Sequence, residues 1–217
     1  MKRTISAMVG HGSVNHNSRK FHAKNTDPER SHLNVTYCQE NIKAVYHELF
    51  DEALERYNAK QTRADRRIEN YYEKIRSGKQ EKPFHEIILQ VGNKDDMSAD
   101  SDEGRLAAAV LDEYIRAFQK RNPNLRVFSA HLHMDEATPH LHIDFVPFTT
   151  GSKRGLDTRV FMFFSFPRKG KGRRDRAFRQ KANRPWALHP YGLFQFRYSK
   201  SCRFLPHLLR ESGPCSG

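Results

Sequence analysis

The sequence predicts an α+β protein in which helices pack on one face of a mainly antiparallel sheet. Two observations predict this class. Segments with strand character alternate with segments whose apolar residues recur every three or four positions. The last two strand-like segments, residues 125–133 and 140–147, are joined by a short turn, which favours an antiparallel pair.

The first half of the chain supplies two strands and a long helical region. Residues 3–9 have the pattern of a short strand, and residues 84–92 have the apolar run of a buried strand. Between them, residues 10–35 form a polar loop that is too long for a simple connection and is therefore a candidate functional segment. After Tyr37 an apolar stripe predicts helical structure as far as the break at Ser77-Gly78.

A second amphipathic helix precedes the last two strands. Its apolar stripe runs from Leu106 to Phe118, after a polar, acidic loop at residues 93–103. The sequence Asn122-Pro123-Asn124 predicts the end of this helix.

Composition allows one hydrophobic core with an appendage, because the chain has 217 residues, of which 37% are hydrophobic and 29% charged. The net charge of +13 indicates a polyanionic partner, and nucleic acid is the commonest one. The charge is uneven: residues 161–217 carry a net +11 and residues 1–160 only +2. We therefore predict a folded domain at 1–160 and a basic tail at 161–217.

The three cysteines, Cys38, Cys202 and Cys215, have no metal-ligand spacing, which is typical of a reduced protein. The residues after Met1 form no apolar signal core, and no apolar stretch reaches the roughly 18 residues that span a bilayer. From these features we expect a soluble, cytoplasmic protein.

Three histidines at the last two strands form a candidate metal site. In an extended strand alternate side chains share a face, so His140 and His142 point one way, and His133 can reach the same face from the end of the partner strand. Three convergent imidazoles suit a divalent ion with open positions for water or a phosphate oxygen. Asp135 and Glu136, in the turn, can orient a ligand or accept a proton.

A single His-x-His pair on a sheet is more often structural than a metal ligand. The third histidine and the adjacent acids are what favour metal binding here. His131 shares the face of His133 and is interpreted as a residue that supports the ligands. Asp144 continues the face of His140 and His142 and is interpreted as a solvated or hydrogen-bonding residue.

The string HMDEATPHLH, residues 133–142, resembles the His-x-Asp-Glu-x-Thr-Pro-His-x-His motif of the MobV relaxases, also called plasmid mobilization or plasmid recombination (Pre) proteins. These belong to the His-hydrophobic-His (HUH) endonuclease class. A second match lies in the long loop, where His16-Asn17-Ser18-Arg19 precedes Arg30-Ser31-His32-Leu33-Asn34. Two separated motifs in the family's order are far more specific than either one. The resemblance covers about residues 3–160.

The resemblance implies a site- and strand-specific DNA nick at the origin of transfer of a plasmid or mobile element. The reaction is a metal-assisted transesterification that leaves the protein joined to the 5′ phosphate. The implied cofactor is a divalent metal, Mn²⁺ or Mg²⁺. The implied partners are single-stranded or supercoiled origin DNA and the coupling machinery of conjugation.

The resemblance also carries roles onto single residues. It places the nucleophile at His16, whose neutral imidazole is competent near neutral pH, and Glu136 is the candidate to orient or deprotonate it. The alternative for His16 is a loop histidine that only contacts DNA phosphate. Tyr37 is the best rival nucleophile, whereas Tyr71-Tyr72 fits the apolar stripe and is interpreted as packing.

Three further residues of the long loop are predicted to bind DNA: Asn17, Arg19 and Arg30. Guanidinium groups favour bidentate contact with phosphate. For Arg30 a role in bracing the loop is equally compatible with the sequence.

After Gly155-Leu-Asp-Thr-Arg159 the family likeness ends, and the chain becomes rich in Phe, Arg and Pro. Residues 161–217 are either a basic DNA-binding arm, with aromatics that stack on bases, or the product of out-of-frame translation. We favour the second interpretation, because composition changes where the likeness ends.

Two rival functions remain open from the sequence. A three-histidine metallohydrolase of a small phosphoester or amide would form no covalent adduct with single-stranded origin DNA in Mn²⁺. A non-catalytic DNA-binding protein would still bind DNA after His133→Ala and would never cleave it.

Overall fold

A computed structural model of the chain describes residues 5–21 and 23–161. Its strands are β1 (Ile5–Val9), β2 (Val35–Gln39), β3 (His85–Val91), β4 (Leu125–His133), β5 (His140–Thr149) and β6 (Arg159–Val160). Its helices are α1 (Val14–Asn17), α2 (Ile42–Ala59), α3 (Tyr71–Ser77), α4 (Asp102–Arg116) and α5 (Phe118–Arg121), with single 3₁₀ turns η1 (Pro28–Leu33) and η2 (Ala64–Arg66).

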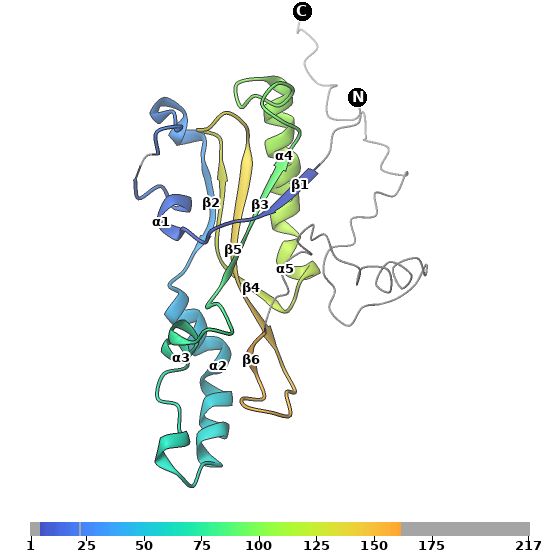
Figure 1. Cartoon of the computed structure of the whole chain (residues 1–217). Helices are drawn as coiled ribbons and strands as arrows, with labels where there is room; N and C mark the ends of the chain where they lie inside the picture. The colour runs from blue at the N-terminus through green and yellow to red at the C-terminus, as the bar shows by residue number, and fades with distance from the viewer. Residues whose placement is uncertain (1–4, 22, 162–217) are drawn as a thin grey trace, which may run out of the picture. The chain divides into compact units, whose positions relative to one another are not determined.

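The strands form one antiparallel sheet in the order β1-β3-β5-β4-β2, and β6 pairs with the far end of β5 (Figure 1). The predicted α+β class and the predicted antiparallel pair of β4 and β5 are confirmed. These two strands occupy the centre of the sheet, with β3 and β2 beside them. Side chains at the turn end of β4 and β5 are therefore flanked by strands on both sides.

A bulge in β4 sets which side chains face the candidate site. Val127 pairs with Phe145, but Ser129 pairs with the adjacent residue Asp144, so one extra residue lies between them. A shift of one residue moves every following side chain to the opposite face. Ser129 and the two β4 histidines that follow it thereby come to the same face as Asp144.

The other face of the sheet carries the apolar core under α4 and α5. Leu141, Ile143 and Phe145 of β5 are fully buried there, and the Phe145 ring lies 6.4 Å from that of Phe118. Helix α4 is capped by the preceding residue, Ser101, whose side chain accepts a hydrogen bond from the Gly104 amide. A Cβ on Gly104 would collide with the Ser98 carbonyl oxygen, so this close approach of backbone requires glycine.

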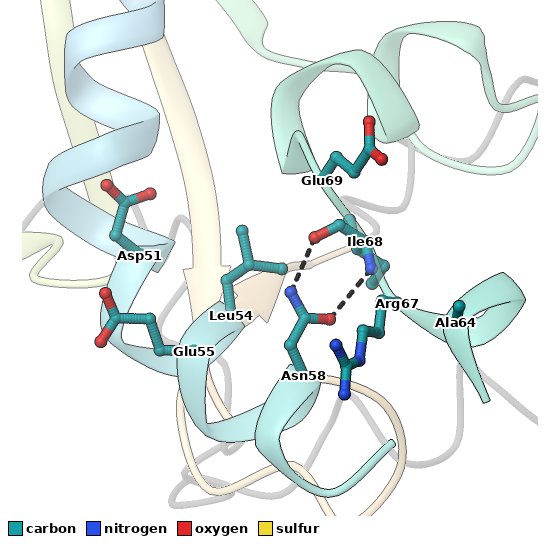
Figure 2. A pocket seen from close by; sticks show the side chains of 8 residues that line it. All are labelled: Asp51, Leu54, Glu55, Asn58, Ala64, Arg67, Ile68 and Glu69. Carbon is teal, nitrogen blue, oxygen red and sulfur yellow. Dashed lines mark hydrogen bonds between the residues drawn. The ribbon is translucent and has the colours of Figure 1, made fainter. Parts of the chain in front are cut away.

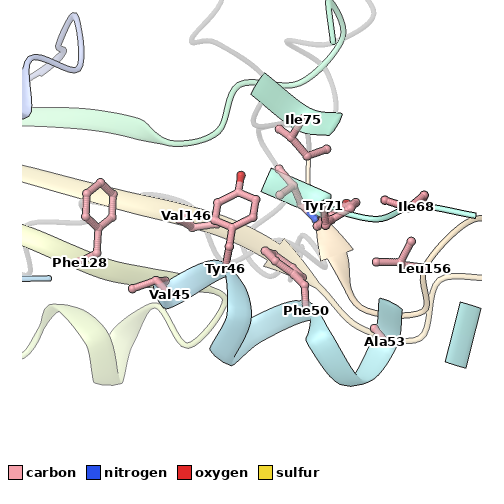
Figure 3. Close-up of a cluster of buried hydrophobic side chains, with 11 residues drawn as sticks. Val45, Tyr46, Phe50, Ala53, Ile68, Tyr71, Ile75, Phe128, Val146 and Leu156 are labelled. Atoms are coloured by element: carbon pink, nitrogen blue, oxygen red, sulfur yellow. Dashed lines mark hydrogen bonds between the residues drawn. The ribbon is translucent and has the colours of Figure 1, made fainter. Parts of the chain in front are cut away.

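A second cluster of buried side chains lies at the far end of the histidine-bearing face (Figure 3). Helices α2 and α3 pack there on Phe128 and Val146, and Tyr46, Phe50 and Tyr71 fill the centre. The helices thus cover both faces of the sheet, where the sequence led us to expect one. Tyr71 is 7% exposed, and its hydroxyl oxygen accepts a hydrogen bond from the Val160 amide. It is therefore a packing residue, as the apolar stripe indicated.

The structure differs in detail from the expectations for the helical region after Tyr37 and for the loop at residues 10–35. Val35–Gln39 is a strand, and Asn41 then caps α2 by accepting a hydrogen bond from the Lys43 amide. The helical region up to Ser77 is interrupted, because α2 ends at Ala59 and α3 begins only at Tyr71, with η2 between them. The loop at 10–35 contains α1 and η1. Among the helices of the described residues, none combines the length and the apolar composition that a membrane crossing requires.

The predicted tail, residues 161–217, lies outside the described residues except for Phe161. The Phe161 amide donates to the Pro147 carbonyl oxygen and so continues the pairing of β6 with β5.

Candidate metal centre

The three histidines proposed as ligands meet at the turn end of β4 and β5. His133 pairs directly with His140, and His142 follows two residues later on the same face. All three are buried, with 1%, 8% and 4% of their surfaces exposed. The ring centroids are 5.2 Å apart for His133 and His140, 4.7 Å for His133 and His142, and 5.0 Å for His140 and His142.

One nitrogen of each ring is fixed by an oxygen that can only accept a hydrogen bond. His133 Nε2 donates to the Asn17 carbonyl oxygen (2.8 Å), His140 Nδ1 to the Thr138 carbonyl oxygen (2.9 Å), and His142 Nδ1 to Glu86 Oε1 (2.6 Å). The bonded nitrogen must carry a proton, so in a neutral ring the other nitrogen has a free lone pair. Histidine ligands of metals are commonly held in this way.

The remaining nitrogens fit a cation. His133 Nδ1 and His142 Nε2 are buried and have no hydrogen-bond partner within the described part of the chain, a costly arrangement unless something binds them. Two sets of ligand atoms lie within 4.8 Å of one another: His16, His133 and His142, and His133, Glu136 and His140. The predicted trio is divided between these sets, and His133 belongs to both.

His133 and His140 are held in the form that binds metals. Burial, and then the nearby His142 and Arg19, lower the pKa of His133 to about 2. Burial and His142 also lower the pKa of His140. Neutral imidazoles are therefore present at neutral pH, and protons compete weakly for their lone pairs.

Glu86 of β3 is a member of the site that the sequence did not reveal. It is 4% exposed, and its carboxylate accepts hydrogen bonds from His142 Nδ1, Asn17 Nδ2 (2.9 Å) and the Gly12 amide (2.7 Å). Burial alone would raise its pKa, but these three donors outweigh burial and lower it. A Cβ on Gly10 would collide with the Glu86 side chain, so the chain passes very close to this carboxylate. The one signal was an acid directly before the apolar run of residues 87–89 in this strand.

His16 lies across the centre from the sheet. It is in α1, its side chain is 26% exposed, and its ring lies 5.8 Å from that of His142 and 6.1 Å from that of His133. Burial, followed by the positive charge of Arg19, lowers its pKa. His16 is thus the most accessible of the four imidazoles and is neutral at neutral pH. Glu136 Oε1 lies 3.9 Å from His16 Nε2 and 3.7 Å from His140 Nε2.

Arg19 binds the two acids of the turn. Its guanidinium donates to both oxygens of Asp135 (2.9 Å and 2.5 Å) and to Glu136 Oε1 (2.8 Å). Asp135 also accepts from Asn34 (2.7 Å) and Ser31 (3.2 Å). Burial opposes ionisation of Asp135, but the hydrogen bonds from Arg19 and Asn34 hold its pKa at about 2. The guanidinium of Arg19, predicted to contact DNA phosphate, is engaged by these protein groups.

The other two predicted DNA contacts also fall on supporting positions. Asn17 is 1% exposed, and its amide donates to Glu86 and Asp144 (2.9 Å each), so its side chain lies beneath the site. Arg30 bonds Asp27 and the carbonyl oxygens of Met134 and Glu136. Of its two proposed roles, this geometry matches bracing of the loop.

The rival nucleophile Tyr37 lies on the opposite face of the sheet. Its neighbour Thr36 hydrogen-bonds His131 on the histidine face, whereas the Tyr37 hydroxyl donates to Asp112 of α4 (2.8 Å). Burial and Asp112 raise the pKa of this phenol. His131 is 3% exposed, and burial lowers its pKa to about 4. Its bond to Thr36 matches the supporting role that the sequence suggested.

Asp144 closes the floor of the site. It is fully buried and accepts hydrogen bonds from Asn17 and Ser129 (2.9 Å each), so it is a hydrogen-bonding residue and is not solvated. Burial raises its pKa to about 6.

A separate hollow of about 490 Å³ lies between α2 and the segment around η2 (Figure 2). Asn58 crosses it with two hydrogen bonds to the Ile68 backbone, of 2.8 Å and 2.9 Å. Its lining residues are Asp51, Leu54, Glu55, Asn58, Ala64, Arg67, Ile68 and Glu69. It contains none of the histidines, and we assign it no chemistry.

Fold and site together define a class: antiparallel α+β proteins whose central strands carry a histidine cluster able to hold a metal ion. The model of the plasmid recombination enzyme family (Mob_Pre) matches residues 13–162, and the chain belongs to this family. The resemblance found in the two sequence motifs is thereby confirmed. No protein of curated function matches the chain.

Two solved structures of the MobM relaxase domain (MOBV; Mob_Pre), both Mn-bound and in complex with plasmid pMV158 oriT DNA, are similar to this chain. The complex with 22 nucleotides, at pH 5.5, is 24% identical over 68% of this chain and 72% of that chain, with a TM-score of 0.41. The complex with 23 nucleotides is 22% identical over 68% and 71%, with a TM-score of 0.38. Likenesses at this level assign no residue role in this chain.

Proposed function

We propose that the protein is a relaxase that nicks one DNA strand at an origin of transfer and stays covalently joined to the 5′ phosphate. One observation carries the proposal. Three buried imidazoles are each fixed through one nitrogen, with the other nitrogen free, and a fourth, more exposed imidazole faces them from α1. Membership of the plasmid recombination enzyme family supports DNA as the substrate.

The proposed metal ligands are His133, His140 and His142. A divalent cation bound there supplies a Lewis acid that polarises the scissile phosphate. Glu136 lies within 4.8 Å of the ligand atoms of His133 and His140 and can add a carboxylate oxygen to the imidazole nitrogens, so Mn²⁺ is the first ion to test and Mg²⁺ the second.

The proposed nucleophile is His16. A lone pair of its ring attacks phosphorus, the N–P bond forms, and the bond from phosphorus to the 3′ oxygen breaks. The leaving 3′ oxygen takes up a proton, and the imidazole, cationic after the attack, releases one. Glu136, at 3.9 Å, is the proposed acceptor of that proton. Reversal of the same step rejoins the strand.

Arg19 acts through its partners in this proposal. Its guanidinium binds Asp135 and Glu136 of the turn, and its Nη1 lies 3.3 Å from His16 Nε2 of α1. Arg19 thereby fixes the position of α1 relative to the turn.

The proposed function sets the surroundings in which the protein acts. Plasmid DNA lies in the cytoplasm, and the free Cys38 fits a reducing compartment, so we propose a cytoplasmic location. If the nicked strand is transferred, the coupling machinery of conjugation is the expected partner of the covalent adduct.

We also propose that residues 1–160 are the nicking domain and that residues 161–217 are translated out of frame. The family model ends at residue 162, which supports this boundary. Translating the other two frames of the coding DNA beyond codon 160 tests the idea. A continuation similar to the family supports it, and the absence of one in both frames contradicts it.

The decisive experiment uses the full chain, Mn²⁺ and single-stranded oligonucleotides tiled across the DNA that flanks its gene. We expect a protein–DNA adduct that survives a denaturing gel at alkaline pH, and mass spectrometry should place the DNA on His16. His133→Ala should abolish the adduct. Cleavage without an adduct would instead indicate a hydrolase, and binding without cleavage a non-catalytic DNA-binding protein.

A further inference from the structure

An aromatic side chain lies exposed at the rim of the metal centre. Phe21, four residues after α1, has 50% of its surface exposed. Its ring centroid lies 6.0 Å from that of His16, with the two planes inclined at 51°. The His16 ring therefore has His133 and His142 within contact range as well as a large apolar surface that is open to solvent.

The backbone before Phe21 explains how this ring reaches His16. Arg19 has a φ of 51°, a left-handed conformation that costs energy in any residue with a Cβ. The ion pairs of Arg19 with Asp135 and Glu136 hold this conformation, and the amides of Arg19 and Lys20 donate to the carbonyl oxygens of His16 and Asn15 (3.0 Å each). The chain thereby turns back at the end of α1 and brings Phe21 to the ring of His16.

Two lysines flank Phe21 along the chain. Lys20 and Lys24 are both exposed. Glu136, an acid of the turn, is already bound by Arg19 through Oε1 and by Asn25 through Oε2 (2.8 Å each). An exposed aromatic ring between lysines is the combination with which proteins hold single-stranded nucleic acid, because the ring stacks on a base and the lysines attract phosphates.

We infer that Phe21 is the stacking platform for the nucleobase next to the reacting phosphate of single-stranded DNA, and that Lys20 and Lys24 attract the adjoining phosphates. The inference rests on the proposed function, which places that phosphate between His16 and the three histidines. A base in a duplex is stacked on its neighbours and cannot also cover Phe21. The platform therefore selects unpaired DNA at the nick site, whatever the identity of the base.

Binding is measured in EDTA, so that no cleavage occurs, with a labelled oligothymidylate of about 12 nucleotides, within the range of sites that such proteins cover. Phe21→Ala should weaken binding about 5- to 100-fold, and Phe21→Trp should retain it. Leu106→Ala, which removes an equally exposed apolar side chain from α4 on the opposite side of the sheet, is the matched control and should change nothing. Lys20→Ala and Lys24→Ala should each reduce the slope of log affinity against log salt by about 0.7.

Phe21→Trp also gives a direct signal. The chain has one tryptophan of its own, Trp186, so the response of the wild type is subtracted from that of the variant. We expect single-stranded DNA to quench the emission of the introduced indole, and the same oligonucleotide annealed to its complement to leave it unchanged. The inference is overturned if Phe21→Ala binds as tightly as the wild type, or if DNA leaves the emission of folded Phe21→Trp unaltered. Stacking without an adduct in Mn²⁺ would refute the proposed function alone, and an adduct without stacking would refute this inference alone.

Discussion

Glu86 Oε1 lies 2.6 Å from His142 Nδ1 and 2.9 Å from Asn17 Nδ2, so one carboxylate oxygen holds both a proposed metal ligand and the residue after the proposed nucleophile. The second oxygen binds the Gly12 amide, just before α1. The carbonyl oxygen of Asn17 in turn accepts a hydrogen bond from His133 Nε2. The metal centre and α1 are therefore parts of one hydrogen-bonded unit.

Glu86→Gln should weaken Mn²⁺ binding about 10- to 100-fold, the usual effect of losing a partner of a ligating histidine. Three donors converge on Glu86, and a glutamine offers one oxygen in place of two, so at least one donor must face an NH₂ group. Isothermal titration of metal-free protein measures the effect. Glu113→Gln, an exposed glutamate of α4, is the control. Equal Mn²⁺ affinity in Glu86→Gln and the wild type would refute the role.

His16→Ala and His133→Ala should separate the nucleophile from the ligands. Both variants should lose the covalent adduct. Only His133→Ala should lose Mn²⁺ affinity, and by more than the roughly 10- to 100-fold expected for an outer partner. His16 can also join His133 and His142 as a ligand, since the three lie within 4.8 Å. If His16→Ala reduced metal affinity as strongly as His133→Ala, His16 would be a ligand and another group the nucleophile.

Tyr37→Phe should form the adduct at close to the wild-type rate. The Tyr37 hydroxyl is bonded to Asp112 on the opposite face of the sheet, and its raised pKa makes it a poor nucleophile. Single-turnover cleavage with saturating Mn²⁺ checks this. Loss of the adduct in a folded Tyr37→Phe protein would return Tyr37 to the catalytic role.

Arg19→Ala should lower the free energy of unfolding by about 3 kcal/mol, because it leaves the buried carboxylate of Asp135 without its cation. Arg116→Ala removes an exposed ion pair of α4 and should leave stability nearly unchanged. Urea titration in EDTA compares the two. A similar small loss in both would show that Asn34 and Ser31 suffice to stabilise Asp135.

Metal-free protein should lose stability as the pH falls from about 6.5 to 4. Burial lowers the pKa of His131 to about 4, so in this window the unfolded chain binds a proton that the folded protein does not. His131 alone contributes a slope of up to about 1.4 kcal/mol per pH unit. His131→Leu should reduce the slope measured by urea titration across this range. An unchanged slope would mean that His131 is not held neutral in the fold.

The sequence predicted the parts of the site that depend on local spacing. Alternation in a strand places His140 and His142 on one face, and the short turn brings His133 opposite them. The position of His133 also depends on the bulge between Val127 and Ser129, for which no residue pattern gave a sign. His133 therefore faces the other two histidines as predicted, but it does so because of a bulge that the sequence did not reveal.

The missed features depend on contacts between distant segments. Glu86 meets His142 only because β3 pairs with β5, and Asn17 is buried only because α1 packs over both. Motif membership marked Asn17 and Arg19 as important, but it could not distinguish a residue that touches DNA from one that positions its neighbours. The position of Tyr37 could not be predicted because residues 35–39 were not recognised as a strand, and alternation within that strand turns Tyr37 away from His131.

The pairing of β4 with β5 also bears on the order in which the chain folds. The three imidazoles lie within one hairpin, whose closure costs little chain entropy. By contrast, β1 must find β3 (Ile5 with Val91), and β2 must find β4 (Val35 with Leu132), across loops of most of the domain. Pairings between such distant residues form slowly. A cation can therefore be captured by the hairpin early, and the edge strands, together with the segment that carries His16, join afterwards.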